Sequence, residues 1–303
     1  MRFDLEQQKR VRKSKNLSRF RTHYTGSPMV YATLWERLQL TNITEARIDP
    51  FIEKVGLDKA IDYFFMGIHL LACYPKEEEA EGTFAHCDRT WSDWAWAHVK
   101  KINLLVSEVI VWPPSFNNPD NEADPTTETI FIITVDGTHC KIEEPTLSAF
   151  NKNKSFYSHK FNAPGLDYEI AISVHTGDCI WVSGPFPAGC PDIKVFRQEN
   201  GLKTKMMEAQ ARSGLKQRGI GDKGYHGESL LLVVPSSHDT DEVREFKSRA
   251  LARHETFNSR LKNFDCLDER FRHHSFEKHQ QCFFACAVIT QLHIENGHPL
   301  FTV

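Results

Sequence analysis

One short segment constrains the fold of this chain more than any other. Residues 129–136, TIFIITVD, are almost all apolar or β-branched and end in an aspartate. A run of this length and composition is typical of a buried strand. Similar runs predict further strands at 167–175, 179–184 and 230–235. Any fold that is proposed must therefore contain a sheet in the second half of the chain.

Helical patterns alternate with the later strands. Apolar spacing predicts helices in 191–216 and 241–263 and near 276–295, and Thr176-Gly177 predicts a hairpin turn. Strands first, then strands alternating with helices, predict an α/β (α+β) fold in which a mixed sheet carries helices on its faces.

The first part of the chain has a different character. Residues 28–112 read as mainly helical, with a short helix at 76–86 and Thr90 as the expected N-cap of a longer one. This outline fits a helix-turn-helix, and equally a small helical bundle. Residues 113–128 hold four prolines and four acidic residues and are predicted to form a linker before a second domain at 129–303.

Charge is distributed unevenly along the chain. The whole chain of 303 residues carries a net charge of −3, whereas residues 1–27 carry +6, from eight basic and two acidic residues. A basic arm on an acidic body is typical of a phosphate-contacting or nuclear-targeting tail, and the alternative is a solvated terminus. No segment reaches ~18 uninterrupted apolar residues, so we expect no membrane span.

The eight cysteines include no Cys-x-x-Cys pair, which excludes the common zinc fingers and ribbons. The histidines and cysteine near the acidic motifs described next also match no zinc pattern: His139, Cys140, His175 and His254.

Three acidic residues stand out by their context. Asp136 ends the apolar run and precedes Gly137, and Asp222 lies between Gly221 and Gly224 in GIGDKGYHG. The glycines let the backbone turn sharply and leave space beside the carboxylate. Glu255 is expected on the face of a helix that carries small residues, opposite an apolar stripe.

Such a set of carboxylates suits phosphodiester cleavage. In-line attack on a phosphate builds charge on the attacking and leaving oxygens, and two divalent metal ions about 4 Å apart neutralise both. Mg²⁺ or Mn²⁺ would be held by Asp136, Asp222 and Glu255, which would repel one another without cations. The basic residues expected to contact DNA phosphates are Lys223, Arg253, Arg260 and Lys262.

Each acidic residue taken alone also has an ordinary structural explanation. An aspartate at a strand end is commonly a cap, an aspartate between glycines a turn former, and a glutamate among arginines a surface ion pair. Only the three together point to a metal site.

Taken in order, VDGTHC, GDKGY and RHETFNSRLK resemble the motifs of DDE-type transposases of the Harbinger class. The segment 184–196, GPFPAGCPDIKVF, resembles the family's Pro-Gly-x-x-x-Asp segment and places Asp192 at its acidic position. The resemblance covers roughly residues 60–275. It implies a ribonuclease-H-like fold and metal-dependent cutting and transfer of DNA strands. It also implies that Asp136, Asp222 and Glu255 are catalytic and bind metal, with Asp192 as a second-tier acid that tunes the site or caps a helix.

The resemblance also implies partners and a location. DNA is the expected substrate, a homo-oligomer is expected because transposition joins two DNA ends, and relatives use a separate Myb-like DNA-binding protein. The basic arm and the family together imply a nuclear location.

Three alternatives remain at this stage. The chain is a catalytically inactive, domesticated descendant that binds DNA or acts as a scaffold, or it is a nuclease of the same fold without strand transfer. A small-molecule metallohydrolase has less support, because basic surroundings favour long polyanions.

Overall fold

The computed structural model describes residues 28–116, 129–143 and 154–303. The predicted basic arm at 1–27 and residues 117–128 of the predicted linker lie outside this part of the chain. Contacts divide the chain into two units. Unit 1 comprises the residues up to Val109 together with Arg260–Pro299, and unit 2 comprises Ile110–Ser259 and Leu300–Val303. Residues 260–299 therefore group with the N-terminal helices, whereas the sequence analysis placed them in the second domain.

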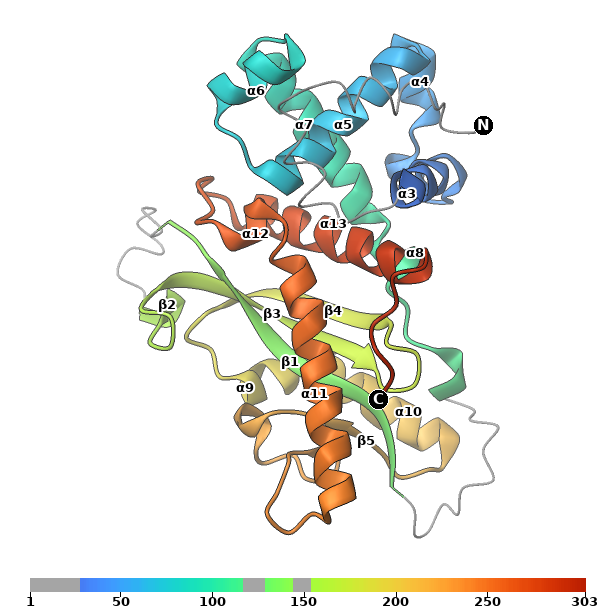
Figure 1. Ribbon diagram of the computed structural model, residues 1–303, viewed down its shortest axis with the longest axis vertical. Helices are drawn as coiled ribbons and strands as arrows, with labels where there is room; N and C mark the ends of the chain where they lie inside the picture. The colour runs from blue at the N-terminus through green and yellow to red at the C-terminus, as the bar shows by residue number, and fades with distance from the viewer. Residues whose placement is uncertain (1–27, 117–128, 144–153) are drawn as a thin grey trace. The chain divides into compact units, whose positions relative to one another are not determined.

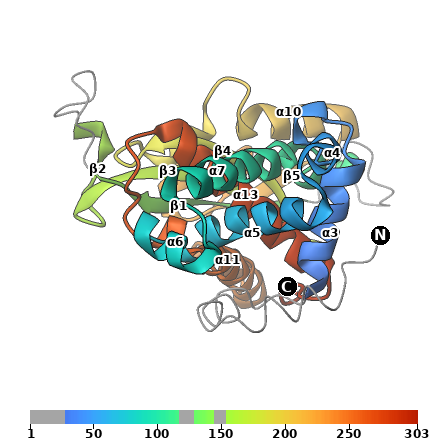
Figure 2. The same ribbon diagram turned by 90° about the horizontal axis from the view of Figure 1, so that it is seen from above.

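Unit 1 is built from helices. They are α3 (Pro28–Leu40), η2 (Thr44–Ala46), α4 (Asp49–Val55), α5 (Leu57–Cys73), α6 (Glu77–Phe84), α7 (Asp88–Leu104), α8 (Val106–Val109), α12 (Asp265–Asp268) and α13 (Phe276–Glu295). Helix α7 contacts both α5 and α13, and the three run side by side in Figures 1 and 2. The helical character predicted for 28–112 is thus confirmed.

The core of unit 1 explains why α5 and α13 both pack against α7. Each carries a long run of buried apolar residues, and α13 buries Phe283, Val288 and Leu292 completely. A helix that is apolar on most of its faces is stable only when it is surrounded. None of the described helices has the length and hydropathy needed to cross a membrane.

The predicted cap at Thr90 is wrong. Helix α7 begins at Asp88 with Cys87 as its N-cap, so Thr90 lies within the first turn. The thiol of Cys87 contacts the Thr90 hydroxyl at 3.1 Å, which occupies the side chain that was expected to cap the helix. The short helix, break and longer helix predicted at 76–105 are present as α6 and α7.

Unit 2 is built from a mixed sheet and the helices that flank it. Its elements are η3 (Pro114–Phe116), β1 (Ile130–Lys141), η4 (Lys154–Phe156), β2 (Tyr157–Ser158), β3 (Ala163–Ser173), β4 (Cys179–Pro187), α9 (Asp192–Phe196), α10 (Leu202–Ser213), β5 (Gln217–Ile220), η5 (Lys223–Tyr225), β6 (Leu232–Val233) and α11 (Asp241–Leu261). Helix α11 ends just past the boundary between the units. The strand order is β2-β3-β1-β5-β6, and β4 also pairs with β3.

Strand directions follow from the connections. The hairpin β3–β4 is antiparallel, as predicted, and β1 is antiparallel to β3. The longer connections that contain helices make β5 parallel to β1 and β6 parallel to β5. This mixed α/β sheet flanked by helices is that of a ribonuclease-H-like fold.

Helices cover both faces of the sheet (Figure 1). On one face Phe196, Leu202 and Met206 pack on apolar residues of β1, β3 and β4. On the other, Ala250 and Phe246 of α11 pack against Ile220 and Phe131. The core therefore runs on both sides of β1, which explains the continuous apolar run that was read from the sequence.

Two strand boundaries differ from the prediction. The strand expected at 230–235 is reduced to β6, two residues long, and Leu230 is exposed. Strand β1 continues five residues past Asp136, because β3 pairs with it as far as Lys141. That long-range pairing has no local signal in the sequence, since Gly137 breaks the apolar pattern there.

Candidate active site

Asp136 lies in the middle of β1, at the point where β5 stops pairing with it. The last parallel pair is Thr134 with Ile220, whereas β3 still faces Asp136 through Ile170. The carboxylate accepts a hydrogen bond from the Gly137 backbone N–H at 2.8 Å and one from the Asn258 side-chain amide at 3.2 Å. Asp136 therefore occupies a fixed position beside the end of β5 rather than a strand end.

Asp222 follows β5 directly. It caps the short helix η5, and its Oδ1 accepts a hydrogen bond from the Gly224 backbone N–H at 2.7 Å. The residue is exposed. Because β1 and β5 are parallel neighbours and pair last at Thr134 and Ile220, Asp222 follows the end of β5 on the side where β1 carries Asp136.

Glu255 is exposed on α11, and the small residues Ser248, Ala252 and Ser259 on its face are exposed too. The predicted opposite stripe is buried at Ala250, Phe257 and Leu261, as the helical pattern required.

Three neighbours of Glu255 hold α11 against the sheet. Arg253 donates hydrogen bonds to the backbone carbonyls of Ser173 and Val174 at 2.8 and 2.7 Å. His254 contacts the Thr134 hydroxyl at 2.9 Å, and burial lowers its pKa to about 3, so the ring is neutral. With Asn258 bonded to Asp136, these contacts set the rotation of the helix and thus the side from which Glu255 projects.

Asp192 lies between the two aspartate segments. It opens α9, and a Cβ built on Gly137 would come 3.1 Å from its Oδ1. A Cβ on Gly224 would come 2.3 Å from its Oδ2 and 2.9 Å from Asp222 Oδ1. The Asp192 carboxylate therefore lies close to both glycine backbones, and a side chain at Gly224 would displace it. The structure therefore gives this second-tier residue a place within the group.

The charges of the other acids act on Asp136 and on Asp192. Burial, followed by the charge of Glu255, raises the pKa of Asp136 to about 7, and Asp222 and Asp192 add to the effect. Burial and then the charge of Asp222 raise the pKa of Asp192 to about 6, against the opposing charge of Lys160. The structure therefore brings together all four acids singled out in the sequence.

Within the part of the chain that the structure describes, no three acidic, histidine or cysteine side chains converge closely enough to form a ready-made metal site. The four acids interact by charge without sharing one coordination shell.

Arg253 does not have the position expected of a DNA contact. Its side chain is 2% exposed and is engaged with two backbone carbonyls, so the guanidinium is not available to a phosphate. Arginines on a helix look alike in sequence whether they face solvent or the sheet, and only the packing of α11 separates the two cases.

The other three predicted contacts differ among themselves. In unit 1, Arg260 donates to the carbonyls of His298 and Pro299, and Lys262 donates to that of Leu267. In unit 2, Lys223 is exposed beside Asp222. Lys160, an exposed residue in the turn before β3, acts on Asp192 and was missed, because no motif surrounds it.

The sequence reasoning also missed two buried polar residues of this region. Asn258 was overlooked although it lies three residues after Glu255, one helical turn along α11. Glu169 is 2% exposed in β3, directly opposite Gly137, and accepts a hydrogen bond from the indole of Trp181 at 3.2 Å. Burial raises the pKa of Glu169 to about 8.

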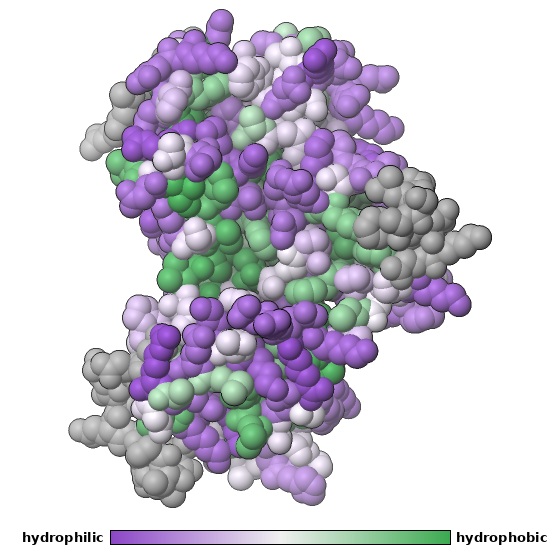
Figure 3. Space-filling view, turned by 180° about the vertical axis from the view of Figure 1, so that it is seen from behind, coloured by the Kyte–Doolittle hydropathy of each residue, from purple (hydrophilic) through white to green (hydrophobic). Residues whose placement is uncertain are grey.

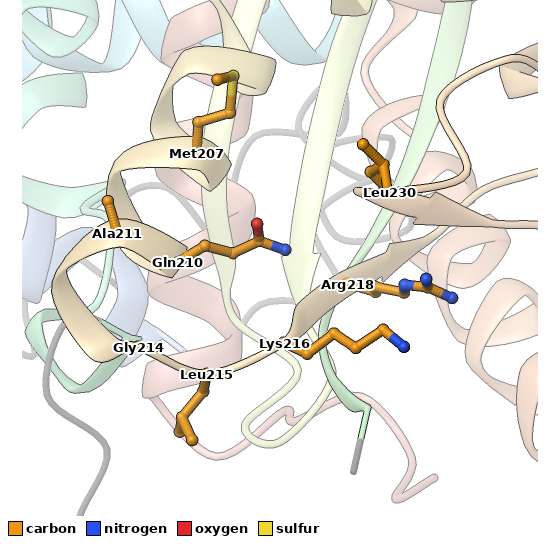
Figure 4. Close-up of a pocket in the computed structure, with 8 residues that line it drawn as sticks. All are labelled: Met207, Gln210, Ala211, Gly214, Leu215, Lys216, Arg218 and Leu230. Atoms are coloured by element: carbon orange, nitrogen blue, oxygen red, sulfur yellow. The ribbon is translucent and has the colours of Figure 1, made fainter. Parts of the chain in front are cut away.

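A separate open pocket lies at the other end of β5. In Figure 4 the side chains of Lys216, just before β5, and Arg218 of β5 extend toward the same side, with Leu230 near Arg218 and Met207 of α10 farther away. The pocket contains none of the predicted site residues. Hydrophilic residues cover most of the face seen in Figure 3, and hydrophobic residues gather in patches among them.

Comparison of the sequence with known protein families identifies one family. The family model described as DDE superfamily endonuclease matches residues 135–291, just over half of the chain. The match contains all four acids and extends past 275, where the resemblance seen in the sequence ended. Neither the curated proteins nor the solved structures gave a match. By the extent of the family match, the chain belongs to the DDE superfamily endonucleases.

Proposed function

We propose that this protein is a DNA-cutting enzyme of the transposase type, of the Harbinger class, in which Asp136, Asp222 and Glu255 hold two divalent metal ions, Mg²⁺ or Mn²⁺. The observation that carries the proposal is that Glu255, Asp222 and Asp192, from three separate segments inside the family match, all act by charge on the buried Asp136. Membership in a family of endonucleases supports nuclease activity and DNA as the substrate.

The donor set fits hard divalent cations. Carboxylate oxygens are the ligands that Mg²⁺ and Mn²⁺ prefer, and no basic side chain bonds to the carboxylates of Asp136 or Asp222 among the hydrogen bonds described. When bound, such ions would neutralise the charge that builds on the attacking and leaving oxygens of a phosphodiester. A raised pKa at Asp136 is the expected state of such a site when only protons compensate its charge.

The residues of the chain contribute position. Gly137 and Asn258 fix the carboxylate of Asp136, and Gly224 fixes that of Asp222. Glu255 is exposed, so its side chain can change rotamer without disturbing the core. Lys223 and Lys160 are exposed near these acids and would contact phosphates on either side of the cut.

One observation favours a second candidate, a catalytically inactive descendant that binds DNA or acts as a scaffold. The described residues hold no preformed group of three metal ligands. A chain that had lost catalysis would keep the fold and its basic surface, but its carboxylates would no longer lie close enough together to bind the same metal ions.

Cutting of DNA distinguishes the two candidates. The full chain, wild type and Asp222→Asn, would be incubated with plasmid DNA and Mn²⁺ or Mg²⁺, with a chelator as the blank. Metal-dependent nicking that Asp222→Asn abolishes would establish the enzyme, and comparison of joined with merely cut products would separate a transposase from a simple nuclease. Binding of DNA without cutting by either protein would favour the inactive descendant.

The proposal extends to partners and location. Transposition joins two DNA ends, so we propose a homo-oligomer and a separate Myb-like DNA-binding partner. The basic arm at 1–27 supports a nuclear location. Size measurement with and without DNA, and imaging of the chain with and without residues 1–27, would test these points.

A further inference from the structure

A small, partly enclosed cavity lies beside the acidic group, on the α9 face of the sheet. Its walls come from β1, β3, β4, α9 and η5, and they include Glu169, Asp192 and Tyr225. The space open to the centre of a water molecule is about 10 Å³, which is the size of one water site.

Two buried polar atoms in this wall lack a protein partner. Glu169 Oε1 and the Tyr225 hydroxyl have no hydrogen bond, and each side chain is only 2% exposed. Burying such groups without a partner is costly, so a folded protein normally supplies one. Of the two other acids in the wall, Asp167 is already bonded to His139 at 2.9 Å, which leaves Asp192.

We propose that this cavity holds one ordered water molecule, through which Glu169 and Tyr225 position the carboxylate of Asp192. The hydrogen-bond count closes: the water accepts from the Tyr225 hydroxyl and donates to Asp192, and its bond to Glu169 Oε1 runs in either direction according to whether that carboxyl carries a proton. Three segments are joined in this way, namely β3 through Glu169, the Asp222 turn through Tyr225, and the start of α9.

The water matters for the site because Asp192, which it would hold in place, lies beside the backbone of the other two aspartates. Its carboxylate lies against Gly137 and Gly224, so a small movement of Asp192 would press on the backbone beside Asp136 and Asp222. Glu169 and Tyr225 are therefore positioning residues that act through Asp192. This consequence rests on the proposed function, whereas the water itself does not.

The direction in which Tyr225→Phe changes the Tm tests whether the water is present. Tyr225→Phe removes only the hydroxyl, so with a bridging water present it should lower the Tm of the full chain by roughly 1–2 °C. Tyr74→Phe is the matched control, because that buried hydroxyl accepts a hydrogen bond from the Arg272 backbone N–H at 2.8 Å. An unchanged or higher Tm for Tyr225→Phe, beside a lower one for Tyr74→Phe, would overturn the proposal. So would a high-resolution crystal structure with no water density in the cavity.

The effect on catalysis needs a separate measurement. Glu169→Met should lower Mn²⁺-dependent cutting by roughly tenfold, and Glu169→Gln, which can still bond to the water, should lower it less. Combined with Asp192→Asn, Glu169→Met should add no further loss, since both act on one carboxylate. Additive losses would refute the positioning role. A wild-type chain that cuts no DNA would refute the proposed function, while the Tm and density results would still decide the water.

Discussion

At the scale of one residue, the carboxylate of Asp136 is less readily ionised in the folded chain than in the unfolded chain. Its pKa of about 7 in the folded chain lies above the ordinary value of 3.8. The proton is therefore bound more tightly in the folded state. The contribution of Asp136 to stability is complete below about pH 4 and is lost as the pH rises through 7.

We predict that, without divalent cations, the free energy of unfolding falls by roughly 2–4 kcal/mol between pH 4 and pH 7.5 because of this residue. Asp136→Asn should flatten that dependence, leaving the smaller part due to Asp192. Urea titrations at several pH values would measure it, with the exposed Asp241→Asn as the control. An equal slope in wild type and Asp136→Asn would show that Asp136 titrates normally.

Gly224 is a second residue at which a single substitution should change the site. An added Cβ would come within 2.3 Å of Asp192 Oδ2 and 2.9 Å of Asp222 Oδ1. We predict that Gly224→Ala abolishes metal-dependent cutting by displacing both carboxylates, while the chain stays folded. Gly82→Ala on α6 meets nothing within 4 Å and should leave cutting intact and helix stability equal or higher. Full activity of Gly224→Ala would show that the turn moves freely.

The sequence was informative about site residues wherever a motif accompanied them. Asp136, Asp222, Glu255 and Asp192 each belong to a recognisable segment, so all four could be named. Glu169 and Asn258 could not, because their importance comes from strand register and helix rotation, which are set by distant parts of the chain.

At the scale of elements, α11 shows where sequence reasoning succeeds and where it stops. Helical periodicity identified its buried stripe and the exposed side of Glu255. The same periodicity could not tell which arginine inserts between α11 and the sheet, because the acceptors are backbone carbonyls at the end of β3. The length of β1 was hidden for a similar reason, since β3 extends it.

We predict that Arg253→Ala loosens α11 and lowers the free energy of unfolding by about 3 kcal/mol, because two carbonyls lose a charged donor. The salt dependence of DNA binding should not change. Lys223→Ala should do the opposite, with unchanged stability and a smaller salt slope. Chemical denaturation and binding at several salt concentrations would measure both. A shallower slope for Arg253→Ala at constant stability would restore this residue as a phosphate contact.

At the scale of the whole molecule, the division into units is not the one that the sequence indicated. The proline-rich acidic segment at 113–128 suggested one boundary, but residues 260–299 complete unit 1. Composition marks linkers and cannot show that a late helix packs among early ones. Helix α13 belongs with α7 because its apolar surface has no partner nearby in sequence.

We predict that a fragment of residues 129–303 is poorly soluble or unfolds at a much lower temperature than the full chain. Without α5 and α7, buried residues of α13 such as Phe283 and Leu292 would face water. Expression yield and thermal unfolding of the fragment beside the full chain would check this. A fragment that melts cooperatively at the Tm of the full chain would mean that α13 is stable without the N-terminal helices.

The interleaved path of the chain also governs the order in which the protein can form on the ribosome. Unit 1 begins the chain, yet its core lacks α13 until residues up to Glu295 have been made. Apolar residues of the first helices that contact α13 therefore stay exposed to water while the sheet is synthesised. The early helices of unit 1 thus complete their core only after the sheet has been made, and a nascent chain halted before residue 276 should expose apolar surface that chaperones bind.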